Sequence, residues 1–420
     1  MLGLALGVIL GLALRYGIGT DNASSLATIW FKPFGDAFVS LIRMLVVPLI
    51  FTTLVAGVTA MGDPARLGSL GGRALLMYML TTWIAVSIGL VIGTIIQPGA
   101  GFDVSNIPAS ELASAQDKLA ANDANLGLTE RLVGIIPTNP IASFANGDVL
   151  QIIFFAIFIG IGCLMAGDQG RPLASIIESG ADVMMKITQI VMEAAPFGVL
   201  ALMTWVMATQ GLSVFVVLGK MVICLYLACI LHMLITYGGI IKLICRLPLI
   251  RFVRGVADAQ AVAFSTSSSN ATLPVTMACA RNNLGVSRPI ASSVLPLGAT
   301  INMDGTALYQ GLIALFAAQA FGIEMTLPIY GMVMLTATLV SIGTAGIPSV
   351  SLFLAATTLS VIGATPEQTV IVIAVLFPFD RLLDMMRTVT NVTGDSAVAV
   401  AVARWENELD EESFRAKATV

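Results

Sequence analysis

Charged and amide side chains gather in residues 380–395, between the apolar runs 371–378 and 396–403. At about 100° per residue, four of them share one face of a helix: Asp384, Arg387, Asn391 and Asp395. The planar guanidinium of Arg387 matches a carboxylate in a bidentate way, and Asp384 can accept an ammonium group. Asn391 and Asp395 supply oxygen atoms that suit a small, hard cation. This face predicts a site for a zwitterion with an extra carboxylate, next to a cation.

A plainer interpretation is that Asp384 and Arg387 form an internal ion pair that braces the protein. It accounts for two residues of the face and leaves Asn391 and Asp395 without a role. The residues alone leave both interpretations open.

A second polar group, residues 298–306, interrupts an otherwise apolar segment. Asn302 and Asp304 supply oxygen atoms, and Gly305 is expected to loosen the helix so that carbonyl groups turn toward an ion. The absence of Cys and His from these residues favours a hard cation over a transition metal. A glycine kink with a solvated Asp304 is the alternative. His232, the lone histidine, lies in another apolar segment and is interpreted as a packing residue without a functional role.

The composition predicts that these groups lie inside a membrane protein. Of the 420 residues, 57% are hydrophobic and 11% are charged, against about 25% charged in soluble chains. Residues 74–96, 149–167 and 221–241 contain no charge, and each run approaches the ~20 residues of a spanning helix. Continuous apolar runs exclude the alternating pattern of a membrane barrel. The fold class is therefore all-α and polytopic, and the five cysteines are interpreted as core thiols.

Apolar runs predict helices near residues 3–17, 36–61, 73–97, 183–209 and 213–243, and a broken helix over 130–166. Basic residues in the 62–73 and 242–254 loops predict that these loops, and both termini, are cytoplasmic. The acidic 98–130 segment then faces outward, and the mixed-charge residues 404–417 are expected to form a solvated tail.

Two apolar segments in the second half contain helix breakers. Residues 265–274 are rich in serine and threonine, and residues 343–348 interrupt an uncharged stretch that runs from 325 to 366. Broken helices at membrane depth are tolerated where they line a cavity, and a pair of them points to the binding site of a transporter. We predict two re-entrant hairpins whose tips meet, with two kinked spans as the alternative.

These features resemble the dicarboxylate/amino acid:cation symporters, the family of glutamate transporters and archaeal aspartate transporters. The resemblance covers almost the whole chain, and its motifs occur in order: 32–35, 137–140, 146–151, 265–274, 302–306, 341–346 and 384–395.

The resemblance implies a homotrimer with eight transmembrane helices and two re-entrant hairpins per protomer, built with inverted repeats. A transport domain would move across a scaffold domain like an elevator. The implied divisions are scaffold helices 1 and 2 in 1–72, transport helix 3 in 73–97, the outer loop and scaffold helices 4 and 5 in 98–212, and the transport domain in 213–404. The last division would hold hairpins at about 253–282 and 325–362, and residues 405–420 would be the cytoplasmic tail.

The resemblance also implies roles for single residues. Arg387 would hold the side-chain carboxylate of the substrate and Asp384 its amino group, with further contacts from these residues: Asn391, Thr306, Thr388, Ser268, Ser269, Ile347 and Ser351. Up to three sodium ions would be co-transported. The first would bind Asp395 and backbone oxygens of Gly298, Asn302 and Asn391. The second would bind backbone oxygens of Thr300, Met303, Ser341, Ile342 and Thr344, and the third would bind Tyr78, Thr81, Thr82, Asn302 and Asp304.

The chain departs from the family pattern at several positions. The archaeal members carry an arginine where this chain has Ser267, and the animal members carry one where it has Met385. Ser349 and Ser351 stand where the archaeal proteins have glycines. Gln310 replaces the proton-carrying glutamate of the animal transporters, which implies sodium coupling without obligatory proton symport or potassium antiport.

The leading hypothesis is sodium-coupled symport of L-aspartate and/or L-glutamate across the plasma (inner) membrane. The nearest alternative is a proton- or sodium-coupled C4-dicarboxylate carrier, which Asp384 disfavours because succinate has no ammonium. A neutral substrate would leave Arg387 unpaired in a dry site. An anion channel is a remote alternative, because the hairpins show no selectivity filter. An enzyme is not expected, because no His or Lys base lies near the hairpin hydroxyls, and no nucleic-acid partner is expected.

Overall fold

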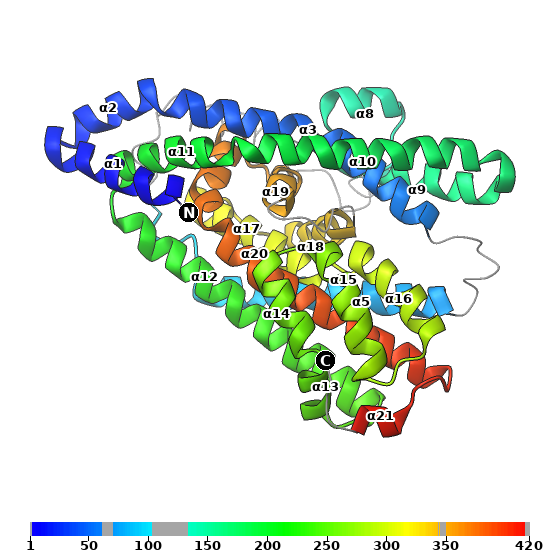
Figure 1. The fold of residues 1–420 in the computed structure, drawn as a ribbon. Coiled ribbons are helices and arrows are strands. Elements are labelled where there is room, and N and C mark those ends of the chain that lie inside the picture. Colours follow the sequence, from blue (N-terminus) through cyan, green and yellow to red (C-terminus); the bar gives the residue numbers. More distant parts are fainter. Residues whose placement is uncertain (1, 61–69, 103–132, 343, 345–349, 416–420) are drawn as a thin grey trace.

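The structure is a computed structural model that describes residues 2–60, 70–102, 133–342, 344 and 350–415. Within these ranges the chain forms α-helices, short 3-10 and π-helical segments and no β-sheet, so the all-α fold class is confirmed for them. The helices form two groups, which Figure 1 shows as an upper and a lower layer.

The upper layer contains α1 (Leu2–Ile18), α2 (Thr20–Trp30), α3 (Lys32–Ala60), α8 (Pro140–Asn146), α9 (Val149–Met165), α10 (Arg171–Glu193) and α11 (Ala195–Gln210). The long helix α3 packs against α9, α10 and α11, and α1 packs along α11. The predicted broken helix over 130–166 is confirmed by α8 and α9. The predicted single helix over 183–209 is wrong, because α10 begins at Arg171 and the chain bends by 53° between α10 and α11. Helix α2 was not predicted.

The lower layer contains α5 (Leu70–Ile96), α12 (Ser213–His232), α13 (Leu249–Gly255), α14 (Ala257–Thr266), α15 (Ser269–Asn282), α16 (Arg288–Ile301), α17 (Asp304–Phe321), α18 (Leu327–Ile342), α19 (Val350–Val361), α20 (Pro366–Trp405) and α21 (Glu411–Arg415). Two π-helical segments, Met233–Tyr237 and Ile240–Ile244, extend α12. Helix α17 packs against α5, α18, α19 and α20, while α20 also packs against α14, α15 and α16. These two helices therefore form the centre of the layer.

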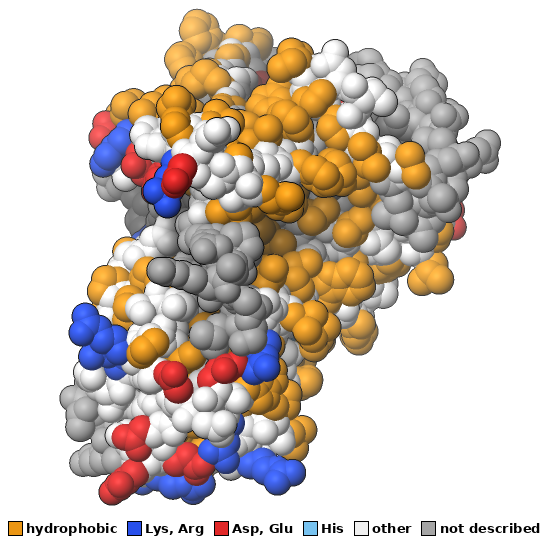
Figure 2. All heavy atoms as spheres, turned by 90° about the vertical axis from the view of Figure 1, so that its right-hand side faces the viewer, with side chains coloured by type: hydrophobic (Ala, Val, Ile, Leu, Met, Phe, Trp, Pro, Cys, Tyr) orange, Lys and Arg blue, Asp and Glu red, His pale blue; other side chains and the backbone are white. Residues whose placement is uncertain are grey.

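Two helical stretches among the described residues are long and apolar enough to cross a membrane, Gly72–Ile96 and Phe215–Ile244. The bent pair formed by α10 and α11 would add a third if it counts as one span. This criterion uses length and composition only. In Figure 2, hydrophobic side chains cover much of the visible face, whereas charged side chains gather at its lower end.

Both interrupted segments double back as helix pairs. Helices α14 and α15 pack against each other across a turn at Ser267 and Ser268, and Ser267 has a left-handed backbone with φ 53°. Helices α18 and α19 also pack together. The predicted second tip, residues 343 and 345–349, lies outside the described residues. Two packed pairs favour hairpins over kinked spans.

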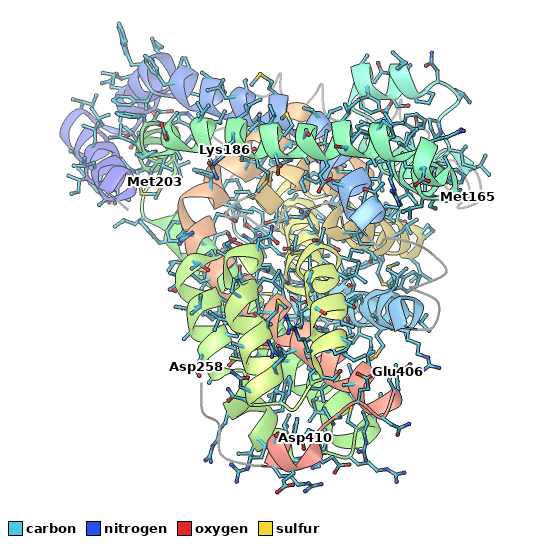
Figure 3. The ribbon with its side chains drawn as sticks, turned by 45° about the vertical axis from the view of Figure 1, so that its right-hand side comes forward. Met165, Lys186, Met203, Asp258, Glu406 and Asp410 are labelled. Atoms are coloured by element: carbon cyan, nitrogen blue, oxygen red, sulfur yellow. The ribbon has the colours of Figure 1, made fainter. Side chains whose placement is uncertain are left out.

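The predicted C-terminal tail is exposed over much of residues 406–415, but it folds back against the lower layer instead of extending freely. Phe414 is 1% exposed, and the backbone N–H of Asp410 donates to the carbonyl of Gly285 at 2.8 Å. A side chain at Gly285 would clash with the Asp410 carbonyl, since its Cβ would lie 2.1 Å from that oxygen. Arg404 hydrogen-bonds Glu411 and lowers the pKa of that carboxyl. Figure 3 places Glu406 and Asp410 at the lower end of the molecule. We name residues 406–415 the C-terminal strap.

Candidate functional site

The site forms where the helical path breaks between α16 and α17. Asn302 (φ −88°, ψ 75°) and Met303 (φ −105°, ψ 51°) leave the helical conformation, and α17 begins at Asp304. The predicted role of Gly305 is wrong, because Gly305 is helical and the break precedes it. Its Cβ would lie 2.4 Å from the carbonyl oxygen of Arg387, so glycine instead lets α17 approach α20.

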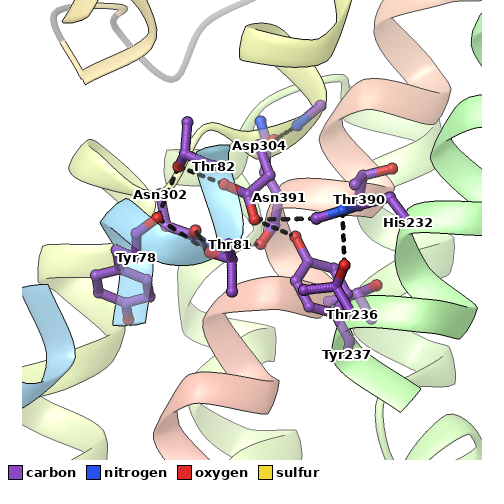
Figure 4. Close-up of polar contacts among 12 residues, drawn as sticks. Tyr78, Thr81, Thr82, His232, Thr236, Tyr237, Asn302, Asp304, Thr390 and Asn391 are labelled. Atoms are coloured by element: carbon purple, nitrogen blue, oxygen red, sulfur yellow. Dashed lines mark hydrogen bonds and ion pairs between the residues drawn. The ribbon is translucent and has the colours of Figure 1, made fainter. Parts of the chain in front are cut away.

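Asp304 is fully buried at this break and gathers partners from three segments. Its Oδ1 accepts from the Thr82 hydroxyl at 2.5 Å, and its Oδ2 accepts from the Tyr237 hydroxyl at 2.7 Å. His232 Nε2 lies 3.2 Å from the same Oδ2 (Figure 4). The Thr81 hydroxyl lies 3.4 Å from Asn302 Oδ1. The alternative of a solvated Asp304 is therefore wrong.

Asp395 lies beside this group on α20. Asn302 Nδ2 donates to Asp395 Oδ1 at 2.9 Å and to the carbonyl oxygen of Asn391 at 3.4 Å. A Cβ on Gly298 would lie 2.5 Å from Asp395 Oδ1 and 2.6 Å from the Tyr78 hydroxyl. The missing side chain of Gly298 therefore leaves room for a carboxylate and a phenol against the α16 backbone. The residues expected for the first and third sodium ions thus lie together.

The residues expected for the second sodium ion are less closely joined. Helices α16 and α18 pack together. Thr300 lies in the last turn of α16, Met303 follows that helix, and Ile342 is the last residue of α18. The hydroxyls of Ser341 and Thr344 donate to carbonyl oxygens of residues 338 and 340, at 2.7 and 2.8 Å. These side-chain bonds stay within one segment.

Arg387 is buried on α20 between two carboxylates. Its NH2 lies 2.9 Å from Asp384 Oδ1 and 3.1 Å from Asp380 Oδ1. Its NH1 donates to the Ser351 hydroxyl of α19, and the Tyr309 ring lies 4.1 Å from the guanidinium carbon. The internal Asp384–Arg387 pair of the plainer interpretation is therefore present.

This pairing does not satisfy the whole guanidinium. Arg387 Nε has no hydrogen-bond partner among the described residues, and neither does Asp380 Oδ2. A buried donor without a partner is uncommon and calls for an explanation such as an absent ligand. Arg387 therefore has a free donor for a further acceptor.

The remaining predicted substrate residues lie on elements that contact α20 or α17. Ser268 caps α15 by accepting from the Ala271 N–H at 3.2 Å, and Ser269 beside it is buried. Thr388 donates to the Asp384 carbonyl at 2.9 Å, and Thr306 is buried in the first turn of α17. Ile347 lies outside the described residues. Both helices of the first hairpin pack on α20.

Gln310 holds the second hairpin to α17. Its amide nitrogen donates to the Ser351 carbonyl at 2.7 Å, and its amide oxygen accepts from Thr358 at 3.0 Å. Ser351 also contacts Arg387. Gln310 and Arg387 therefore both bind Ser351 at the start of α19.

The buried charges do not balance within the described part of the chain. Four carboxylates are at most 6% exposed, those of Asp304, Asp380, Asp384 and Asp395, and Arg387 is the single buried guanidinium. A buried carboxylate without a counter-charge is very costly, so such groups bind a cation or take up a proton. The site is built to hold cations or protons together with its ligand.

Sequence reasoning missed three residues of the site: His232, Tyr237 and Asp380. Asp380 precedes Arg387 by seven residues, two turns of a helix, so the spacing that placed Asp384 on that face also predicts Asp380. His232 and Tyr237 carried no such signal, because their common position depends on the π-helical segment.

Comparisons with known proteins agree with this geometry. Residues 1–405 match the sodium:dicarboxylate symporter family. The chain is 34% identical over 412 residues to a proton/sodium-glutamate symport protein of Geobacillus stearothermophilus, covering 98% of this chain and 94% of that protein. It is 33% identical to the proton/glutamate-aspartate symporter of Escherichia coli (97% and 92% covered) and to C4-dicarboxylate transport protein 2 of Pseudomonas aeruginosa (95% and 90% covered). The match over residues 1–405 and the relatives that cover nearly the full length place this chain in the sodium:dicarboxylate symporter family, as a membrane transporter and not an enzyme.

Proposed function

We propose that this protein carries L-aspartate and/or L-glutamate across the plasma (inner) membrane, coupled to sodium ions. The observation that carries the proposal is the buried Arg387, with its unpartnered Nε beside the Asp384 carboxylate. A substrate carboxylate would accept from Nε and a terminal nitrogen, in the bidentate geometry that guanidinium favours. The substrate ammonium would then compensate Asp384.

Sodium coupling is supported by the type and number of the buried groups. Among the described residues, the four buried carboxylates outnumber the single buried guanidinium by three, and hydroxyl, amide and carboxylate oxygens surround Asp304 and Asp395. Oxygen ligands without sulfur favour a hard cation. In the proposal, up to three sodium ions enter with the substrate and leave with it.

The second candidate is a C4-dicarboxylate carrier driven by sodium ions or protons. It is favoured by the relatives that are named for such transport, at almost the same identity as the glutamate carriers. Arg387 would serve a dicarboxylate equally well, but Asp384 would face a substrate without an ammonium group. A substrate ammonium group near Asp384, beside its ion pair with Arg387, therefore separates the two candidates.

The proposed movement is of the elevator type in a homotrimer, with both termini in the cytoplasm. The lower layer would be the transport domain, because α5 and α12–α20 carry every described residue of the site. The upper layer, with α1–α3 and α8–α11, would be the fixed scaffold.

The test is uptake of labelled L-aspartate, L-glutamate and succinate into proteoliposomes, with sodium and proton gradients imposed separately. We expect aspartate or glutamate uptake that needs sodium, and little uptake of succinate. Asp384→Asn should reduce amino-acid uptake more than succinate uptake. Succinate uptake equal to aspartate uptake in the unmodified protein would overturn the role of Asp384, and undiminished uptake without sodium would overturn the cation assignment.

A further inference from the structure

The end of α12 changes from an α-helix to a π-helix at Met233–Tyr237, next to Asp304. In an α-helix of 3.6 residues per turn, residues five apart lie about 140° apart. A π-helix closes its hydrogen bonds from i to i+5, which brings residues five apart nearer to one side of the helix than an α-helix does. The π-helical turn thus lets both His232 and Tyr237 reach one carboxylate oxygen, Asp304 Oδ2, at 3.2 and 2.7 Å.

Packing fixes both side chains. His232 and Tyr237 are fully buried, and their rings meet edge to face with centroids 4.7 Å apart. The Thr236 hydroxyl lies 3.1 Å from His232 Nδ1 and holds the other side of the imidazole. On α20, a Cβ at Gly394 would lie 2.4 Å from the Tyr237 hydroxyl, so the absent side chain makes room for it.

The partners of the Asp304 carboxylate are divided between its two oxygens. Oδ2 contacts His232 and Tyr237, which come from the π-helical side. Oδ1 contacts the Thr82 hydroxyl, on the side where Thr81 lies 3.4 Å from the Asn302 amide oxygen (Figure 4). Partners on one oxygen of a ligating carboxylate orient the other, and their loss commonly weakens ion binding by about 10–100-fold.

We propose that His232 and Tyr237 are positioning residues that hold Asp304 Oδ2, so that Oδ1 faces the coupled cation together with Thr81, Thr82 and Asn302. The inference rests on the proposed function, because it requires Asp304 to bind the cation. It assigns a role to the lone histidine and identifies the π-helical turn as the element that sets sodium affinity.

The experiment compares Tyr237→Phe with Tyr226→Phe in the full chain, reconstituted in proteoliposomes. Both changes remove one hydroxyl from the helix that begins at Ser213, but the Tyr226 hydroxyl donates to the carbonyl of Leu382, away from Asp304. For Tyr237→Phe we expect the sodium concentration at half-maximal aspartate uptake to rise about 10–100-fold. The maximal rate and the aspartate half-saturation at saturating sodium should stay unchanged, and Tyr226→Phe should behave as the unmodified protein.

A second pair of variants tests the imidazole. His232→Leu should raise the sodium half-saturation, and His232→Gln should restore part of the affinity because its amide can donate to Asp304. A fall in maximal rate without a change in sodium half-saturation would show a packing role and overturn the inference.

The Asp304→Asn variant distinguishes failure of the positioning role from failure of the proposed cation role of Asp304. If Asp304→Asn leaves the sodium titration unchanged, the cation role of Asp304 fails. If it abolishes the sodium response while Tyr237→Phe and His232→Leu keep the unmodified half-saturation, the positioning role alone is overturned.

Discussion

At the scale of single residues, the site is defined by charges that the protein does not neutralise by itself. Arg387 has two carboxylate partners and still keeps an unpartnered Nε. Asp304 and Asp395 are buried without a guanidinium partner in the described residues. Such groups are too costly to keep buried for stability alone, so their ligands complete the site.

The first prediction concerns the geometry of Arg387. Arg387→Lys keeps a positive charge beside Asp380 and Asp384 but removes the planar fork. We expect aspartate to bind about 10- to 150-fold more weakly, equivalent to one lost charged hydrogen bond of about 1.5–3 kcal/mol. Binding is measured by titrating purified protein with aspartate at saturating sodium.

The control for this change is Arg381→Lys on the same helix. Arg381 donates to the Ser265 carbonyl at 3.0 Å and lies outside the cluster, so aspartate affinity should be retained. Unaltered affinity in Arg387→Lys would contradict the bidentate contact, and Arg387→Ala should abolish binding of acidic substrates altogether.

The residues of the site were predictable to the extent that one helix carries them. The 3.6-residue period placed Asp384, Arg387, Asn391 and Asp395 on one face, and α20 does carry them through a single 40-residue helix. The 3.6-residue period of a helix carries no information about contacts between different helices. The bonds from Thr82 and Tyr237 to Asp304 join residues 222 and 67 positions apart, and only the tertiary fold brings them together.

At the scale of elements, helix existence followed from hydrophobicity, while bends and turns depended on packing. Apolar runs predicted α5 and the 213–243 helix correctly, because nothing inside them opposes a helix. The break between α10 and α11, by contrast, lies inside one apolar run, and its sequence signal is a single residue: Pro196 lies in the first turn of α11, where proline favours a helix start. The charge counts predicted the exposure of the C-terminal residues but did not reveal that Phe414 among them is buried.

The second prediction concerns the C-terminal strap. Phe414→Ala removes the buried aromatic side chain of a five-residue helix, a kind of change that costs about 3–5 kcal/mol in folded cores. We expect the strap to detach, and the time course of trypsin cleavage at Arg404 should become faster in detergent solution.

Glu412→Ala is the matched control, because Glu412 is exposed on the same short helix. It should leave the cleavage rate unchanged. Equal rates for Phe414→Ala and the unmodified protein would mean that the hydrogen bonds from Ser287 and Asp410 to residues 408 and 285 hold the strap without the aromatic contact.

At the scale of the whole molecule, the division into two layers is the feature that connects structure to transport. The described residues of the site lie in the lower layer, on α5 and on elements from α12 to α20, and the upper layer contributes none of them. Contacts between the layers involve α3 against α16, α19 and α20, α11 against α12 and α20, and α9 against α18. A carrier that moves its site as one body must slide along such contacts, whereas contacts within the upper layer would persist.

The third prediction tests this sliding with two engineered disulfides of similar geometry. A Cβ at Gly57 of α3 would lie 3.3 Å from Thr300 Cγ2 of α16, across the two layers, and a Cβ at Gly180 of α10 would lie 3.4 Å from Thr52 Cγ2 of α3, within the upper layer. Because a threonine Cγ2 occupies a position that a cysteine Sγ can take, both pairs bring the atoms that a disulfide would join into contact. The five native cysteines are buried and free, so loss of two additional reactive thiols on oxidation reports each new bond.

Oxidised Gly57→Cys/Thr300→Cys should stop aspartate uptake, and reduction should restore it, because the bond fixes the site to the scaffold. Oxidised Thr52→Cys/Gly180→Cys should transport at the rate of its reduced form. Full uptake with the Gly57–Thr300 disulfide formed would mean that α16 and α3 stay together through the transport cycle. Movement of the lower layer as one body would then be excluded, and the hairpins alone would have to open the site to each side.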